Sequence, residues 1–268
     1  MADDSDQIEV EGLRIAFRRR GEGPPLVLLH GGLSDGREWR RQLDRLSDEF
    51  TVVAWDAPGC GQSSDPPETF RMPEYADCLA AFIKALGLDR PHVLGLSFGG
   101  ALALELYRRH PAVPRTLVLV SAYAGWAGSL PAEVVEQRLQ HALRQSEMLP
   151  EQVGPGTIPG LFPESTPAEV VDELVAIMSG FHRVGAVTMP RALAEANLRD
   201  VLPRITVPTL LVYGDSDARA PVSLAEDLHA RIPASKLVVI LGAGHQSNME
   251  AADRFNSEVR NFLRSVSA

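Results

Sequence analysis

Short runs of apolar residues, rich in valine, isoleucine and leucine, recur along the chain between stretches of more polar sequence. Near-continuous apolar runs of this length are typical of strands that are buried on both faces, as in a parallel sheet. We predict buried strands at residues 26–30, 51–56, 92–97, 116–121, 209–215 and 236–242. The two segments before them, 8–12 and 13–20, predict an opening β-hairpin.

Segments with helical periodicity alternate with these strands. They cover residues 37–48, 73–87, 98–110, 222–232 and 250–265. Such alternation predicts a series of right-handed βαβ units. The expected fold class is therefore α/β, with a mostly parallel twisted sheet and helices on both of its faces. A chain of 268 residues, 45% of them hydrophobic, is long enough to bury such a core as one main domain.

The segment 125–201 interrupts this alternation, because no good strand is predicted in it. It contains only helical stretches, at 131–148, 167–181 and 189–199. Sequence rich in proline and glycine separates the first stretch from the second. We expect residues 125–201 to form a helical cap over the sheet, while residues 1–124 and 202–268 form the core domain.

The strand at 92–97 runs directly into a helix through the sequence "VLGLSFGGALAL", residues 93–104. Ser97 stands at the junction, between Gly95 and Gly99. A sharp strand-to-helix turn exposes such a serine above the sheet, and its neighbours must be small because the backbones approach too closely for a Cβ atom. The G-x-S-x-G pattern alone is only a hypothesis, since it also occurs by chance.

Other reactive side chains follow the ends of further predicted strands. Asp215 and Asp217 follow "TLLVYG", His245 follows "KLVVILGAG", and His30 begins "HGG" after "LVLL". In an open α/β sheet, ligands bind at the carboxyl ends of the strands, so we expect these side chains at one edge together with Ser97. The chain order Ser, Asp, His is the order found where a serine turn of this kind sits on an α/β sheet.

A set of motifs gives the chain a clear resemblance to the α/β-hydrolase superfamily. They are "HGG" (30–32), "DAPGCGQS" (56–63), "GLSFGG" (95–100), "YGDSD" (213–217) and "GAGH" (242–245), in the family's order and at its usual spacings. Within the superfamily the chain is most similar to small capped carboxylesterases and enol-lactone hydrolases. Cys60 is a departure, because the family usually has histidine there. That loop is structural in the family, so the departure does not affect the expected catalytic residues.

The chemistry of such a site assigns a role to each residue. Ser97 is the expected nucleophile, and a serine hydroxyl needs a base within hydrogen-bond reach. Histidine, with an ordinary pKa of about 6.5, suits that role, which we assign to His245. Asp217 is expected to hold the far ring nitrogen and to stabilise the imidazolium formed during attack. The backbone N–H groups of Phe98 and Gly32 are the expected donors of an oxyanion hole.

Several positions have alternative interpretations. Asp215 is the nearest rival for the acid, although the resemblance favours the second aspartate of "GDSD". His182, in the expected cap, could contact substrate, but a surface role is the simpler interpretation. We expect structural roles for His30, which would order the oxyanion loop, and for Asp56, which begins a turn. Cys60 is most simply a small residue without a role.

The resemblance also limits the reaction. Relatives that open epoxides or displace halide carry aspartate in place of Ser97, and the expected cap has no tyrosine to activate an epoxide. Relatives that cleave carbon–carbon bonds tend to have asparagine before the serine, where this chain has Leu96. Proline iminopeptidases have proline after "HGG", where this chain has Leu33. The expected function is hydrolysis of an ester or lactone of a small, largely apolar substrate through an acyl-enzyme intermediate. Two alternatives stay open: a cofactor-free haloperoxidase or perhydrolase, and a ligand-binding receptor that retains the fold.

The expected cap offers apolar side chains for a substrate pocket, with few charged residues in the same runs. The candidates are Met148, Leu149, Val153, Ile158, Leu161, Phe162, Ile177, Met178, Phe181, Val187 and Met189. Most of them must pack the cap onto the sheet. Because pockets are mostly apolar with a few polar anchors, we expect neutral, short to medium acyl esters or lactones as substrates.

Composition and charge indicate which binding partners and which cellular compartment to expect. The formal net charge is −9, with lysine and arginine scattered along the chain, which argues against nucleic acid or an anionic membrane and favours a small-molecule substrate. Cys60 and Cys78 are expected to be free thiols in a reducing compartment. With no signal peptide or membrane span predicted, we expect a cytoplasmic protein that needs no cofactor or metal. A homo-oligomer is compatible with the sequence.

Overall fold

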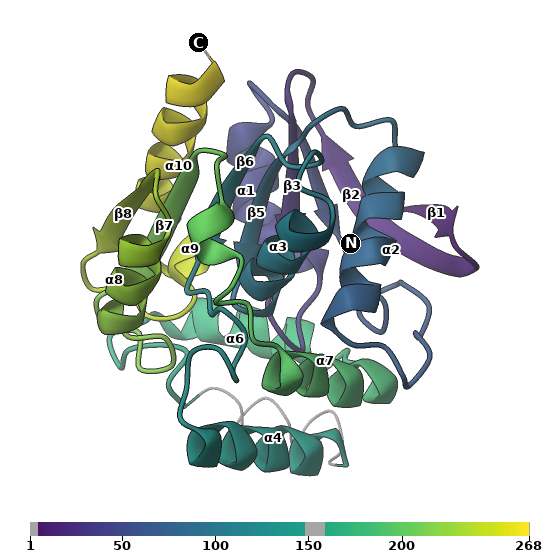
Figure 1. The fold of residues 1–268 in the computed structure, drawn as a ribbon, viewed down its shortest axis with the longest axis vertical. Helices are drawn as coiled ribbons and strands as arrows, with labels where there is room; N and C mark the ends of the chain where they lie inside the picture. Colours follow the sequence, from purple (N-terminus) through teal and green to yellow (C-terminus); the bar gives the residue numbers. More distant parts are fainter. Residues whose placement is uncertain (1–4, 148–158, 268) are drawn as a thin grey trace.

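The computed structural model describes residues 5–147 and 159–267. In this part of the chain, a single eight-stranded sheet has the order β1-β2-β4-β3-β5-β6-β7-β8 (Figure 1). The strands are β1 (Asp6–Val10), β2 (Leu13–Arg20), β3 (Pro25–Leu29), β4 (Thr51–Trp55), β5 (His92–Leu96), β6 (Thr116–Val120), β7 (Thr209–Gly214) and β8 (Ser235–Ile240). Every predicted strand is present, and each bound lies within two residues of the predicted one.

The strand pairing confirms the predicted α/β class. β1 pairs antiparallel with β2 as the expected hairpin, and β2 also pairs antiparallel with β4. All neighbours from β4 to β8 pair in parallel. Because parallel neighbours are joined by crossovers rather than tight turns, β3 can lie between β4 and β5, which follow it in the sequence.

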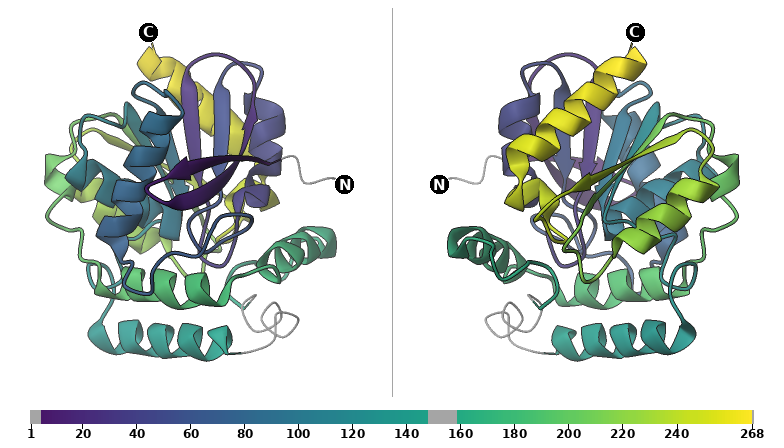
Figure 2. Two further views of the ribbon diagram at one scale, coloured as in Figure 1. Left: turned by 90° about the vertical axis from the view of Figure 1, so that its right-hand side faces the viewer. Right: turned by 90° about the vertical axis from the view of Figure 1, so that its left-hand side faces the viewer.

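Helices cover both faces of this sheet (Figure 2). The helices of the core are η1 (Gly36–Trp39), α1 (Arg40–Leu46), α2 (Met72–Ala85), α3 (Phe98–Arg109), η2 (Leu202–Arg204), α8 (Val222–Arg231), α9 (Ser247–Glu250) and α10 (Ala252–Ser267). Alternate residues of a strand point to opposite faces. In β3, Val27 and Leu29 belong to the apolar core that includes α2, α3 and α8, while Leu26 and Leu28 belong to the one that includes α1 and α10.

Among the described residues, three helices lie together beyond one end of the sheet (Figures 1 and 2). They are α4 (Ala132–Ser146), α6 (Ala168–Met178) and α7 (Arg183–Glu195), and we call them the cap helices. The helix expected at 189–199 is displaced, since α7 begins at residue 183 and has Pro190 in its interior. Proline is favourable in the first turn of a helix, where the expected start at 189 would place Pro190. The packing of α7 against α2, α3 and α4 outweighs the hydrogen bond that Pro190 removes.

Ion pairs connect the cap helices to the core. Glu173 of α6 accepts hydrogen bonds from Arg40 and Arg41 of α1, at 3.1 and 2.7 Å. Glu195 of α7 pairs with Arg71 at 3.0 Å. Exposed pairs of this kind contribute less than about 1 kcal/mol each, so packing contacts must fix the position of the cap helices more strongly than these pairs do.

Candidate active site

Ser97 occupies a strained turn between β5 and α3. Its φ of 52° and ψ of −106° are rare for a residue with a side chain. The backbone N–H of Ser97 donates to the Val120 carbonyl at 2.9 Å, which ties the turn to the end of β6. Phe98 is the first residue of α3, so its backbone N–H has no partner within the helix. The turn leaves Ser97 partly exposed at the wall of a cavity.

Glycines make this turn sterically possible. A Cβ atom on Gly95 would lie 2.1 Å from the Gly99 carbonyl oxygen, and one on Gly99 would lie 2.2 Å from the Leu29 carbonyl oxygen. Neither backbone oxygen can move aside without disturbing the sheet or the helix. Both positions therefore require glycine, for the reason that the sequence motif predicts.

His245 and Asp217 form a buried pair beside the same cavity. Nδ1 of His245 lies 2.8 Å from Oδ2 of Asp217, and each residue is only 3% exposed. The other carboxylate oxygen, Oδ1, accepts from the backbone N–H groups of Arg219 and Ala220, both at 2.8 Å. Burial favours a higher pKa for Asp217, but the charge and hydrogen bond of His245 outweigh it and hold the pKa below its ordinary value. The carboxylate thus favours the tautomer of His245 that carries its proton on Nδ1.

Asp215 lies two residues earlier and has different neighbours. Its Oδ1 accepts from the backbone N–H of Gly242 at 2.7 Å and from the Ser216 hydroxyl at 3.1 Å. The contact with Gly242 holds the loop after β8. Within the described residues, the aspartate that contacts His245 is Asp217.

The loop after β3 brings Gly32 to the cavity. His30 orders this loop, because its Nε2 accepts from the backbone N–H of Ala57 at 3.0 Å and its Nδ1 donates to the Gly31 carbonyl at 2.7 Å. Burial lowers the pKa of His30 and keeps the ring neutral, as these two contacts require. A Cβ atom on Gly32 would meet nothing within 4 Å, so its backbone borders open space. Leu33 follows with a φ of 60°, a second strained residue in the site.

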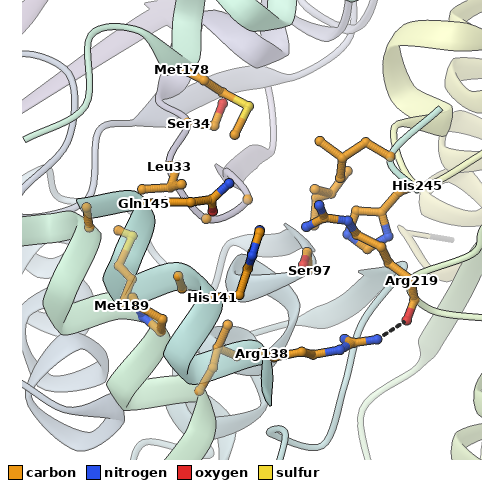
Figure 3. A pocket seen from close by; sticks show the side chains of 18 of the residues that line it. Leu33, Ser34, Ser97, Arg138, His141, Gln145, Met178, Met189, Arg219 and His245 are labelled. Atoms are coloured by element: carbon orange, nitrogen blue, oxygen red, sulfur yellow. Dashed lines mark hydrogen bonds between the residues drawn. The ribbon is translucent and has the colours of Figure 1, made fainter. Parts of the chain in front are cut away.

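The cavity above Ser97 has a volume of about 360 Å³ and lies between the core and the cap helices (Figure 3). Its lining residues are Gly31, Gly32, Leu33, Ser34, Leu96, Ser97, Trp126, Gln137, Arg138, His141, Ala142, Gln145, Leu161, Leu174, Met178, Ala186, Met189, Pro190, Leu193, Arg219, His245 and Gln246. Ser97, His245 and Gly32, which the sequence places in one site, therefore border one space.

The apolar residues expected to line the pocket divide into three groups. Leu161, Met178 and Met189 line the cavity. The residues found elsewhere in the fold are Phe162, Ile177, Phe181 and Val187. Those that lie outside the described residues are Met148, Leu149, Val153 and Ile158.

Sequence reasoning missed the polar residues of the cavity. Arg138, His141 and Gln145 lie along one face of α4 and border the cavity. Their spacing of three and four residues is the signal that was available, but a polar helix face ordinarily faces water. Arg219, two residues after Asp217, and Trp126 complete this part of the wall.

His182 and Asp56, which the sequence analysis also considered, make contacts that hold parts of the fold together. Nδ1 of His182 lies 2.7 Å from Asp65 Oδ1, and its Nε2 lies 3.0 Å from the Gly61 carbonyl oxygen, so it joins the start of α7 to a core loop. His182 is not among the described residues that line the cavity. Asp56 is fully buried and accepts from the backbone N–H of Gly36 at 2.8 Å. Burial raises the pKa of Asp56 to about 6.

The two cysteines, Cys60 and Cys78, are free and buried. Burial raises the pKa of both thiols, that of Cys78 to about 12. Neither is therefore a nucleophile near neutral pH. The Cys60 thiol contacts Met189 Sδ at 3.7 Å, which is a packing contact between the core and α7.

A family model described as "Alpha/beta hydrolase family" matches residues 26–258. The chain belongs to the alpha/beta hydrolase family. This hydrolase is similar to a thermophilic esterase from Thermogutta terrifontis, solved with malate bound, at 31% identity and a TM-score of 0.90 over 98% of this chain and 99% of that one. It is 28% identical to "Serine hydrolase BPHL" of Mus musculus, over 97% of this chain and 86% of that protein. The enol-lactonase from Burkholderia xenovorans shares the fold, with 24% identity and a TM-score of 0.87 over 97% and 100% of the two chains.

Within residues 5–147 and 159–267, no helix combines the length and the apolar character that a membrane span needs. In the same ranges, no three histidine, cysteine, aspartate or glutamate side chains gather in an arrangement suited to a metal ion.

Proposed function

We propose that this hydrolase is a serine esterase or lactonase that acts on a small, largely apolar substrate through an acyl-enzyme intermediate. In this proposal Ser97 is the nucleophile, His245 the base and Asp217 the carboxylate that orients it. The proposal depends on the buried His245–Asp217 pair, at 2.8 Å, which borders the same cavity as a serine with a positive φ. Nucleophilic acyl transfer needs such an arrangement, whereas stable packing does not.

The acylation step follows from these positions. Ser97 Oγ attacks the carbonyl carbon of the substrate, and the serine proton passes to Nε2 of His245. Asp217, which the low pKa keeps ionised, stabilises the imidazolium that forms. The carbonyl oxygen becomes an oxyanion, for which the backbone N–H groups of Phe98 and Gly32 are the proposed donors. The bond to the alcohol oxygen then breaks, and the leaving alcohol takes the proton from His245.

The deacylation step uses the same groups. A water molecule attacks the acyl carbon, while His245 removes a proton from that water and returns it to the oxygen of Ser97. An ester gives a separate alcohol and acid, and a lactone gives one product that carries both groups. A cavity of about 360 Å³ favours a small substrate.

The similar proteins support the same reaction class. The relative with 31% identity is an esterase, and the relative with 28% identity is a serine hydrolase. The enol-lactonase, at 24% identity, supports the fold alone. The ester or lactone specificity proposed for this chain therefore needs a direct test.

A fluorophosphonate probe tests the nucleophile, because groups that activate a serine towards esters also favour its phosphonylation. We expect labelling of the wild-type protein and none of Ser97→Ala. Ser216→Ala, at an exposed serine next to Asp217, is the matched control and should label like the wild type. Full labelling of Ser97→Ala would overturn the proposal.

A panel of p-nitrophenyl esters, lactones and thioesters tests the reaction itself. We expect turnover of esters or lactones by the wild-type protein and a loss of that turnover in Ser97→Ala. Labelling of Ser97 without turnover of any member of the panel would instead favour the ligand-binding receptor.

A further inference from the structure

The loop that carries His245 connects β8 to the short helix α9, and the Glu250 side chain at the end of α9 reaches back to this loop. Oε1 of Glu250 accepts from the backbone N–H of Gln246 at 3.1 Å. The backbone N–H of Gly244 lies 2.9 Å from Oε2 and 3.1 Å from Oε1. One carboxylate therefore holds the residues on both sides of His245.

The backbone N–H of His245 is held by a segment that leads into the cap helix α6. It donates to the carbonyl of Leu161 at 2.8 Å. Thr166, at the other end of the segment 161–166, donates its hydroxyl to Oε2 of Glu250 at 3.2 Å. Three consecutive backbone N–H groups, at positions 244, 245 and 246, thus depend on one carboxylate and on one segment next to the cap helices.

The segment 161–166 packs directly against the loop of His245. A Cβ atom on Gly244 would lie 2.8 Å from the Leu161 carbonyl oxygen and 3.3 Å from Oε1 of Glu250. Burial raises the pKa of Glu250, and the hydrogen bonds that its carboxylate accepts offset this only in part. Apolar packing could fix such a contact without taking a carboxylate out of water, which costs free energy. The place of Glu250 therefore indicates a role beyond packing.

The position of the His245 backbone matters because the ring has two partners in the proposed reaction. Nδ1 lies 2.8 Å from Asp217, while Nε2 must reach the hydroxyl of Ser97. The contact with Asp217 fixes one point of the ring but not the backbone from which the ring projects. A displacement of about 1 Å in a catalytic group can cost about 100-fold in rate. Anchors on the backbone at and beside His245 therefore bear on catalysis.

We propose that Glu250 is a positioning residue for His245, and that its contact with Thr166 makes the position of His245 depend on how the segment 161–166 packs. The inference rests on the proposed function, in which His245 is the base. The alternative is a contribution to stability alone, because Glu250 also returns to Gln246 at the start of its own helix. The two roles differ in what a variant changes once it has folded.

Glu250→Gln keeps the size of the side chain but leaves one acceptor oxygen, so its amide nitrogen would face a backbone N–H. We measure kcat and KM for p-nitrophenyl butyrate, together with the thermal midpoint. In the folded variant kcat should fall by about 10- to 100-fold, while KM changes by less than about threefold. Glu164→Gln, the same change of charge at an exposed residue of the segment 161–166, is the matched control and should keep both constants. A lower thermal midpoint with wild-type kcat in Glu250→Gln would overturn the proposal.

Thr166→Val tests the connection to the segment 161–166, because it removes only the hydroxyl that donates to Glu250. Its kcat should fall by about two- to tenfold, the scale of one hydrogen bond. This variant also decides the question if Glu250→Gln does not fold, and wild-type kcat would then overturn the proposal. A loss of kcat in Glu250→Gln alone would keep the positioning role and overturn the dependence on the segment 161–166.

Proton NMR separates failure of this proposal from failure of the proposed function, because it needs no substrate. The Nδ1 proton of His245, shared with Asp217, should give a far-downfield resonance that is absent from Asp217→Asn. The resonance should broaden or disappear in Glu250→Gln and persist in Glu164→Gln. Such a loss supports the positioning role even if the wild type hydrolyses no ester. An unchanged resonance in Glu250→Gln would overturn that role, and ester hydrolysis by the wild type would then leave the proposed function intact.

Discussion

Asp215 and Asp217 are two positions apart in the sequence but lie in different environments. β7 ends at Gly214, and the chain then leaves the sheet. Asp215 stays exposed and holds the Gly242 N–H, whereas Asp217 is buried against His245. Replacing each aspartate by asparagine therefore separates a catalytic contribution from a structural one.

Asp217→Asn should lower kcat by up to about 10⁴-fold, the scale known for serine-protease triads, because the amide permits the wrong tautomer of His245. Asp215→Asn should keep kcat and lower the free energy of unfolding by about 1 kcal/mol, because it weakens the hydrogen bond to Gly242. Both variants need measurements of kcat and of the thermal midpoint. If Asp215→Asn proves inactive but stable, the assignment of the acid is wrong, while the assignment of Ser97 survives.

The sequence predicts the position of some residues of the site but not of others. Ser97 follows the buried strand β5 and His245 follows the half-buried edge strand β8. Because parallel strands end at one edge, both residues could be placed at one site from local patterns. Arg138 lies on a helix, where periodicity defines a polar face but not what that face meets. Its place at the cavity depends on how α4 packs over the core, which is a tertiary property.

The position of α7 depends on a contact between two glycines. Gly59, in the loop that begins at Asp56, has a φ of 83°. A Cβ atom on Gly185 of α7 would lie 2.0 Å from the Gly59 carbonyl oxygen. Because the obstacle is backbone, α7 itself would have to move. The same helix supplies Met189 and Leu193 to the cavity wall, so such a movement would change the cavity.

Gly185→Ala should therefore raise KM several-fold and destabilise the fold by about 1–3 kcal/mol. The sign is informative, because alanine stabilises an unobstructed helix by about 1 kcal/mol relative to glycine. Thermal midpoints and ester kinetics give both values. Arg183→Ala, at an exposed residue in the same turn, is the control and should change neither. A gain of stability in Gly185→Ala would show that the helix accommodates the methyl group, contrary to this expectation.

Elements were predictable where the signal is local. Buried strands have near-continuous apolar runs, so bounds such as Thr116–Val120 follow closely from the sequence. The start of α7 could not be predicted in this way, because proline is typical of the first turn of a helix and Pro190 instead lies in the interior of α7. Packing against α2, α3 and α4 stabilises this helix. The order β4-β3-β5 could not be predicted from local patterns either, since it depends on which strands pair in the folded sheet.

At the scale of the whole molecule, Glu38 links stability to pH. It lies in η1 and is fully buried, and neither carboxylate oxygen makes a well-formed hydrogen bond within the described residues. Burial raises the pKa of Glu38 from 4.5 to about 7, and the nearby Ser34 hydroxyl and Gly31 backbone offset this only in part. The folded protein therefore binds this proton more tightly than the unfolded chain does.

The contribution of Glu38 to stability is full below pH 4.5 and is lost as the pH rises through about 7. Glu38→Gln does not ionise, so its stability relative to the wild type should rise by about 3 kcal/mol between pH 4 and pH 8. Urea unfolding at the two pH values measures this difference. Glu105→Gln is the control: Glu105 is equally buried but pairs with Arg108 at 2.6 Å, so its replacement should lower stability at pH 8. An unchanged difference between Glu38→Gln and the wild type at both pH values would mean that Glu38 ionises in the fold as readily as in the unfolded chain.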